Sequence, residues 1–307
     1  MKPASASPLL AHELLFGAFL LVTWCRLALA LGPVSSEALL YAALLAVNAT
    51  FIWRCHQRPT TLHWHLRLWF YPVAMNIIFP HMKGAIPKIS PVQMDALLQQ
   101  VDGWLVGPNL SLRCESLTNP VLTEMLSGCY LLFFPYLLFS LVYYGLGKLD
   151  LFKRFMIGLF TIYGLGFLGY TWVPASGPYV AMSDQFAVPL RGWWLTAWNT
   201  RIVGLGSNGV DVFPSLHCAV SCYFLLFDRQ HRRWRFWLYL LPCVGLWLST
   251  IYLRYHYFID LVCGFALAAF ALWLANRRDD GKPSAAPATQ RQTPPAATRP
   301  NGLPSNT

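Results

Sequence analysis

Eight apolar runs, separated by short polar segments, account for most of this chain. Several of them reach the roughly 17–25 residues that a transmembrane helix needs. The runs cover about residues 9–31, 36–53, 66–82, 119–146, 153–172, 213–227, 236–253 and 257–275. They predict an all-α fold, a polytopic transmembrane helical bundle of about eight spans.

The composition favours a membrane protein over a soluble one. Only 12% of the 307 residues are charged and 56% are hydrophobic, whereas soluble domains carry about 25% charged residues. The net charge of +10 does not indicate nucleic-acid binding, because the basic residues cluster in short segments between the apolar runs. The chain is therefore expected to form one integral membrane domain without a nucleic-acid partner.

Two of the eight runs are weaker candidates for a span. The run 66–82 contains Arg67, Pro72, Asn76 and Pro80, so its helix is expected to kink or to be re-entrant. The run 213–227 is short, and its helix is expected to start within the headgroup layer. No signal-peptide cleavage site is evident after the first run, which is expected to be a retained span.

The distribution of basic residues predicts the orientation of the chain. With eight spans and the N-terminus inside, most of the 23 Lys and Arg residues lie on the inner side, as the positive-inside rule requires. We therefore expect a multi-pass protein of the plasma (inner) membrane with both termini in the cytoplasm. In this topology His217, His256 and Asp260 all lie at the outer face.

Segments outside the strongest runs have simpler interpretations. Residues 1–7 form a polar lead, residues 8–82 the N-terminal transmembrane helices, and the Pro-, Ala- and Thr-rich residues 279–307 a disordered cytoplasmic tail. The connection 83–118 has apolar residues at helical spacing and is expected to contain an interfacial amphipathic helix. Asp95 and Asp102 lie one heptad apart and so face the same way on it.

His256 and Asp260 are four residues apart at the start of the last run. On a helix this spacing places both side chains on one face. The carboxylate can then hold one imidazole nitrogen and leave the other exposed to a cavity, as in an oriented histidine nucleophile or base. The alternative is a helix-capping pair without chemistry.

His217 follows Pro214 at the start of the sixth run. Proline suits the first position of a helix, and Ser215 and Leu216 then lie among unpaired N–H groups that can bind an anion such as phosphate. A histidine there can exchange a proton with a leaving or attacking oxygen. The alternative is an interfacial histidine, but two such motifs at the same face favour phosphoryl transfer.

These two motifs resemble the type 2 phosphatidic acid phosphatase superfamily over roughly residues 90–275. Within it, the chain resembles the inositolphosphotransferase branch, which includes inositol phosphorylceramide synthases. The further residues that carry the resemblance are Asp95, Asp102, Trp104–Gly107, Tyr170–Pro178, Leu216, Thr250, Tyr252 and Gly264. The resemblance implies a six-helix phosphatase/phosphotransferase-type core, with residues 83–278 as the catalytic membrane domain.

The resemblance also implies roles for individual residues. His256 would attack phosphorus and form a transient phospho-histidine, Asp260 would orient it, and His217 would act as acid and then as base. Pro214, Ser215 and Tyr252 would contribute to substrate binding.

The chain departs from the phosphatase pattern at the expected phosphate-binding cations. The stretch Val173–Pro178 lacks the Lys and Arg-Pro of that pattern, and Thr250 stands where it has an Arg. Arg254, two residues before His256, is the nearest replacement, although a snorkelling arginine is an equal alternative. Arg191 and Arg201 are weaker candidates.

The sequence as a whole predicts an enzyme that moves or removes a phosphate-bearing lipid headgroup, inositolphosphotransferase-like, with a phospholipid or sphingolipid substrate. One alternative is a phosphatase acting on lipid phosphates such as phosphatidate or polyprenyl pyrophosphate. An alternative of another class is a non-catalytic membrane transporter or scaffold. No cofactor is expected. No metal is expected either, and Cys218 and Cys222, one helical turn apart, are interpreted as helix-packing residues.

Overall fold

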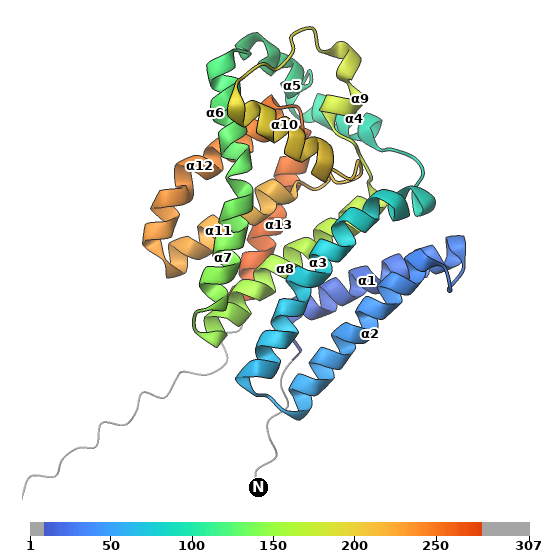
Figure 1. Cartoon of the computed structure of the whole chain (residues 1–307). Helices are drawn as coiled ribbons and strands as arrows, with labels where there is room; N and C mark the ends of the chain where they lie inside the picture. The colour runs from blue at the N-terminus through green and yellow to red at the C-terminus, as the bar shows by residue number, and fades with distance from the viewer. Residues whose placement is uncertain (1–8, 278–307) are drawn as a thin grey trace, which may run out of the picture.

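The computed structural model describes residues 9–277, and within this range all regular structure is helical. The helices form one bundle with a cluster of short helices at one end (Figure 1). The N-terminal helices are α1 (Ala11–Leu31), α2 (Ser36–Gln57) and α3 (Thr61–Ile89). The following elements are α4 (Asp95–Val106), α5 (Leu110–Arg113), η1 (Cys114–Leu117), α6 (Pro120–Leu131), α7 (Phe133–Gly145), α8 (Leu149–Trp172), α9 (Pro178–Ala181), η2 (Ser183–Gln185), α10 (Trp194–Gly206), α11 (Leu216–His231), α12 (Arg233–Tyr252) and α13 (Phe258–Asn276).

Each of the eight apolar runs corresponds to a helix or a pair of helices. The run 119–146 is divided at Leu132 into α6 and α7. The run 66–82 lies within one continuous helix, because α3 continues through Pro72, Pro80 and Pro87. The predicted lead 1–7 and tail 279–307 lie outside the described residues.

Five helical segments are long and apolar enough to cross a membrane, which supports a membrane protein. They are Ala11–Leu31, Ser36–Gln57, Pro120–Gly145, Leu149–Trp172 and Phe258–Asn276. The other three runs do not meet this standard. Helix α11 has only 16 residues. Helix α3 contains Arg67, two lysines and three prolines, and α12 contains two arginines and one internal proline. The full count of eight spans stays a prediction.

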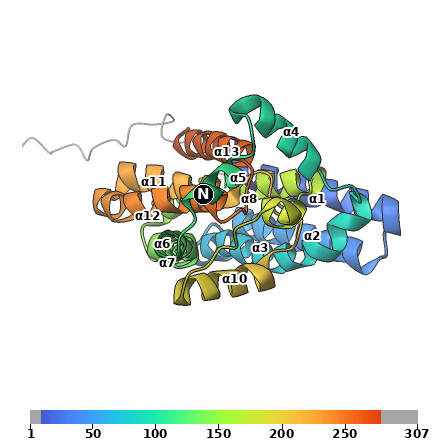
Figure 2. The same ribbon diagram turned by 90° about the horizontal axis from the view of Figure 1, so that it is seen from above.

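Helix α8 lies at the centre of the bundle, between the N-terminal helices and the pair α11 and α13 (Figure 2). Its glycines permit close contact on both sides. A Cβ atom at Gly164 would lie 3.0 Å from the backbone of Phe16 in α1, and one at Gly166 would lie 2.3 Å from the side chain of Leu216 in α11. The small residues of α8 therefore set how closely the two halves of the bundle approach.

Two arginines bond the N-terminal helices to one another and to α8. Arg67 of α3 donates to both carboxylate oxygens of Glu13 in α1, at 2.6 and 2.5 Å, and both side chains are fully buried. Arg26 of α1 donates to the carbonyls of Thr171 and Ile89, at 2.8 and 3.0 Å. These bonds join α1 to α3 and α8.

The short helices α4, α5, α9 and α10 gather at the end of the bundle where α11 and α13 begin (Figure 1). Helix α4 is the helix expected within residues 83–118. In the connection 173–212, Trp193, Trp194 and Trp198 are 60%, 68% and 46% exposed, and tryptophans are common at membrane interfaces. This cluster of short helices surrounds the starts of the two histidine-bearing segments.

The ion pair between Glu13 and Arg67 gives a test of the packing. Replacing Arg67→Met leaves Glu13 buried without a counter-charge, and we expect a loss of about 3–5 kcal/mol in the free energy of unfolding. The double variant Glu13→Gln/Arg67→Met should recover much of this loss. Thermal unfolding in detergent micelles measures the stability of both variants. If Arg67→Met were as stable as the double variant, Glu13 would not depend on Arg67 as its buried counter-charge.

Candidate active site

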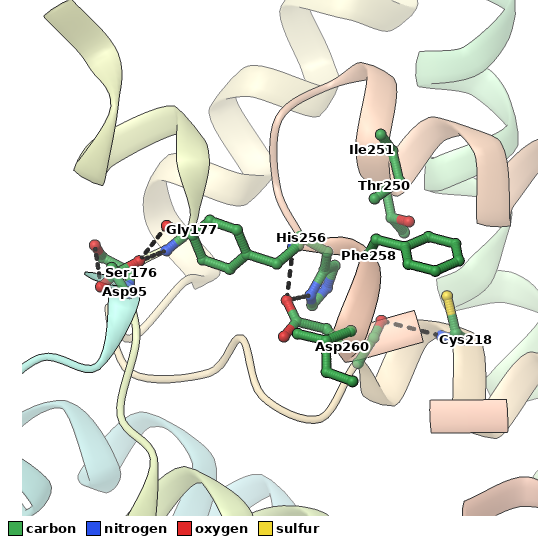
Figure 3. Close-up of polar contacts among 12 residues, drawn as sticks. Asp95, Ser176, Gly177, Cys218, Thr250, Ile251, His256, Phe258 and Asp260 are labelled. Atoms are coloured by element: carbon green, nitrogen blue, oxygen red, sulfur yellow. Dashed lines mark hydrogen bonds and ion pairs between the residues drawn. The ribbon is translucent and has the colours of Figure 1, made fainter. Parts of the chain in front are cut away.

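His256 and Asp260 are in contact and buried at the start of α13. The Nδ1 atom of His256 lies 3.3 Å from Oδ2 of Asp260, and the backbone N–H of Tyr257 donates to the same oxygen at 2.7 Å. His256 lies two residues before the helix, so the contact does not arise from a shared helical face as the spacing suggested. The arrangement leaves Nε2 of His256 as the ring nitrogen that is not bonded to Asp260 (Figure 3).

The backbone of His256 is fixed by the end of the preceding helix. The N–H groups of Tyr255 and His256 both donate to the carbonyl of Thr250, at 2.9 and 3.0 Å. Arg254 makes this turn in a left-handed conformation with φ of 68°, which costs a non-glycine residue about 1–3 kcal/mol. These backbone contacts therefore fix the position of His256 relative to the end of α12.

The start of α11 is bonded to the start of α13. The N–H of Ser215 donates to the carbonyl of Asp260 at 3.0 Å, and Oγ of Ser215 accepts from Cys218 at 3.4 Å as the N-cap of α11. The helix begins at Leu216, so Pro214 precedes the cap and does not occupy the first helical position. The N–H groups of Leu216 and His217 have no backbone or side-chain partner within residues 9–277.

The imidazole of His217 faces that of His256. The two ring centroids are 5.9 Å apart with the planes at 62°, a separation that lets one phosphoryl group contact both rings. Tyr130 and Phe133 pack against His217 with ring centroids at 4.7 and 4.6 Å. The structure thus brings together the three residues that the sequence singled out for chemistry, from α11, α13 and the turn between α12 and α13.

Two aspartates of α4 hold the segment that carries His256. Asp95 accepts from the N–H groups of Ser176 and Gly177, at 3.0 and 2.9 Å, and from the hydroxyl of Tyr257 at 2.8 Å (Figure 3). Asp102 accepts from the N–H groups of Phe258 and Ile259, at 2.7 and 2.8 Å. The two aspartates thus lie on the same face of α4, as predicted, and this face contacts residues 257–259 next to His256.

A further carboxylate, Asp211, belongs to this site and was not predicted. Asp211 and His217 line the same cavity, and Ser207 donates to the Asp211 carboxylate at 3.0 Å. Burial raises the pKa of Asp211 above its ordinary value of 3.8, while the hydrogen bond from Ser207 and the nearby His256 act in the opposite direction. The only signal in the sequence was an acidic residue six positions before His217.

The candidate cations and Tyr252 lie away from the two imidazoles or have other partners. The guanidinium of Arg254 donates to the carbonyl of Val188 at 2.5 Å and lies 3.7 Å from the carboxylate of Glu115. Arg191 and Arg201 are exposed. The hydroxyl of Tyr252 contacts Thr123 of α6 at 2.8 Å. Among the described residues, no group of three or more His, Cys, Asp or Glu side chains is placed to hold a metal ion.

The fold and the paired histidines define a helical membrane protein with a candidate phosphoryl-transfer site. A family model described as the PAP2 superfamily matches residues 97–274, which is more than half of the chain. The protein therefore belongs to the PAP2 superfamily and is a phosphatase or phosphotransferase enzyme. No curated protein matches the chain, and no solved structure matches it. Membership in an enzyme family leaves no support for the non-catalytic alternative.

The contact between α11 and α13 can be tested at Gly264. A Cβ atom there would lie 2.7 Å from the carbonyl oxygen of Ser215, so Gly264→Ala must push the two helix starts apart. We expect turnover to fall roughly ten- to a hundredfold, because small displacements of reacting groups are costly. Gly84→Ala in α3, where a Cβ meets nothing within 4 Å, is the control. Equal turnover in the two variants would contradict this role of the contact.

The raised pKa of Asp211 predicts a pH dependence of stability. The folded state binds this proton more tightly than the unfolded state, so the free energy of unfolding should fall as the pH rises from below 3.8 through the raised pKa. Asp211→Asn should remove this loss and flatten the profile, whereas Asp184→Asn at an exposed site should not. The measurement is the free energy of unfolding in detergent as a function of pH, for the wild type and the two variants. A steeper profile for Asp211→Asn would contradict the expected sign.

Proposed function

We propose that this enzyme transfers a phosphate-bearing lipid headgroup, in the manner of an inositolphosphotransferase, through a phospho-histidine intermediate. The observation that carries the proposal is the His256–Asp260 contact at 3.3 Å with the ring of His217 opposite, 5.9 Å away between centroids. Asp260 orients one histidine as a nucleophile, and the other histidine is placed to exchange protons. By the distribution of basic residues, we propose that the site lies at the outer face of the plasma membrane.

The reaction has two displacements at phosphorus. In the first, Nε2 of His256 attacks phosphorus, the bond to the leaving alcohol oxygen breaks, and His217 gives that oxygen its proton. In the second, the hydroxyl of the acceptor gives its proton to His217, its oxygen attacks phosphorus, and the bond to His256 breaks. Asp260 stabilises the imidazolium form of His256 in between.

The charge of the site favours a phosphodiester over a phosphomonoester as substrate. A phosphomonoester carries about −1.5 to −2 at neutral pH, whereas a diester carries a single negative charge and needs less compensation. Here Ser176 and Gly177, in the stretch that lacks the phosphatase cations, donate to Asp95. Arg254 is already near Glu115. A role for Arg254 in phosphate binding requires the phosphate to compete with that carboxylate.

The choice between transferase and phosphatase is tested with two donors. Purified enzyme in mixed micelles would receive either phosphatidate or phosphatidylinositol, together with ceramide as a lipid alcohol. We expect transfer of the headgroup from the diester and little release of inorganic phosphate from the monoester. Rapid phosphate release from phosphatidate, without transfer from phosphatidylinositol, would instead favour the lipid phosphatase.

The roles of the two histidines are tested by trapping the intermediate. His256→Ala should abolish both turnover and acid-labile labelling of the protein by a radiolabelled donor. His217→Ala should lower turnover by roughly 10²–10⁴-fold, the usual contribution of a general acid or base. It should still allow slow labelling by donors with an activated leaving group. Label that persists in His256→Ala would exclude His256 as the nucleophile.

A further inference from the structure

A cavity of about 290 Å³ lies beside His217 and is lined by residues of α3, α6, α7, α8 and α10. Its polar groups near the active site are His217, Asp211 and Ser207. The rest of its wall is mainly aromatic and aliphatic, with Phe133 of α7 and Phe167 of α8 as examples. A cavity with one polar end at a catalytic histidine and an apolar remainder suits a molecule with a hydroxyl at one end and hydrocarbon behind it.

Helix α3 supplies one wall of this cavity, through Met75, Asn76, Phe79 and Pro80. This helix precedes residues 97–274, which match the family model, so the wall comes from outside the family domain. The position of α3 is fixed close to the active-site loop, because Nδ2 of Asn208 donates to the carbonyl of Phe79 at 3.1 Å. Helix α3 thus supplies a side of the cavity that the matched segment does not supply.

The cavity also reaches the surface of the bundle. Asn76 and Pro80 on α3 and Gly206 on α10 are exposed, and Phe134 on α7 is 42% exposed. All four line the cavity. A volume of about 290 Å³ is too small for a whole lipid, but a chain that enters beside His217 can continue outward between α3, α7 and α10.

The proposed reaction determines which part of the substrate lies beside His217. The histidine that protonates the leaving oxygen in the first displacement also deprotonates the attacking oxygen in the second. The leaving and accepting alcohols therefore occupy the same place, one after the other. Since this place continues into an apolar cavity, both alcohols need apolar bodies, which water and a polar headgroup lack.

Resting on the proposed function, we propose that this cavity binds the hydrocarbon of the lipid alcohol, and that α3 sets which lipids are accepted. The phosphorus–oxygen bond on the lipid side then breaks, and the lipid alcohol leaves with the proton of His217. The headgroup phosphate stays on Nε2 of His256 until the hydroxyl of a second lipid alcohol replaces the histidine. The selectivity for hydrocarbon length thus depends on a helix outside the family domain.

The test narrows the cavity and compares lipids of different chain length. Met75→Trp replaces a flexible thioether side chain in the α3 wall by a bulky indole and so reduces the volume of the cavity. The matched control is Ile77→Trp, on the same helix but 43% exposed and not part of the cavity lining. Donors are dipalmitoyl- and dihexanoyl-phosphatidylinositol with ceramides of long or short chains. We expect Met75→Trp to lower the ratio of long-chain to short-chain kcat/KM tenfold or more, and Ile77→Trp to leave it unchanged.

Val203→Phe, on the α10 wall of the cavity, is a second cavity variant that keeps the test possible if Met75→Trp does not fold. It should shift the ratio in the same direction. Folding of each variant is checked by thermal unfolding and size-exclusion chromatography. Equal ratios in wild type and in the folded cavity variants would overturn the assignment of the cavity, even if wild-type transfer is intact.

The trapped His256 adduct tests the proposed function, and the chain-length ratio tests this inference. An adduct that carries inositol phosphate shows that the lipid-side bond broke. An adduct that carries the diacylglycerol phosphate would overturn the proposed headgroup transfer, whereas an inositol phosphate adduct together with unchanged chain-length ratios in the folded cavity variants would overturn only this inference. The absence of any adduct and any transfer in the wild-type protein would overturn the proposed function itself.

Discussion

The hydrogen bond from the N–H of Ser215 to the carbonyl of Asp260 fixes the starts of α11 and α13 against each other. Gly264 permits this close approach of the two helices, since a Cβ there would lie 2.7 Å from the carbonyl oxygen of Ser215. Each helix start carries part of the site: His217 follows Ser215, and Asp260 holds His256. The distance between the two imidazoles is therefore set by backbone contacts between rigid helices, which is the kind of support that a phosphoryl-transfer site needs.

Other parts of the fold hold this contact in place from outside. Asp102 of α4 accepts the first two N–H groups of α13, and the glycines of α8 allow α11 to approach closely. On the far side of α8, Arg26 bonds α1 to α8 and to the end of α3. That connection matters because α3 forms a wall of the cavity at His217. The N-terminal helices therefore influence the site although they lie outside the family domain.

Local patterns predicted the helices well, because eight apolar runs have few ways to avoid water other than helices in a membrane or core. The contact between His256 and Asp260 was also predicted, but its geometry was not. The turn at Arg254 and the carbonyl of Thr250 place His256 before the helix, and no local pattern shows this. The partners of Asp95 and the place of Asp211 could not be predicted either, because they depend on loops that tertiary contacts position.

The two helix starts differ in how many backbone N–H groups remain to bind a phosphate. At α13 these donors are already used: Tyr257 donates to Asp260, and Phe258 and Ile259 donate to Asp102. At α11 the N–H groups of Leu216 and His217 have no backbone or side-chain partner within residues 9–277, and the positive end of the helix dipole adds to them. In the proposed reaction the phosphate oxygens therefore lie at α11, with His256 on one side and the apolar cavity on the other. This geometry lets attack and departure occur on opposite sides of phosphorus, and it replaces the missing cations with backbone donors that suit a singly charged diester.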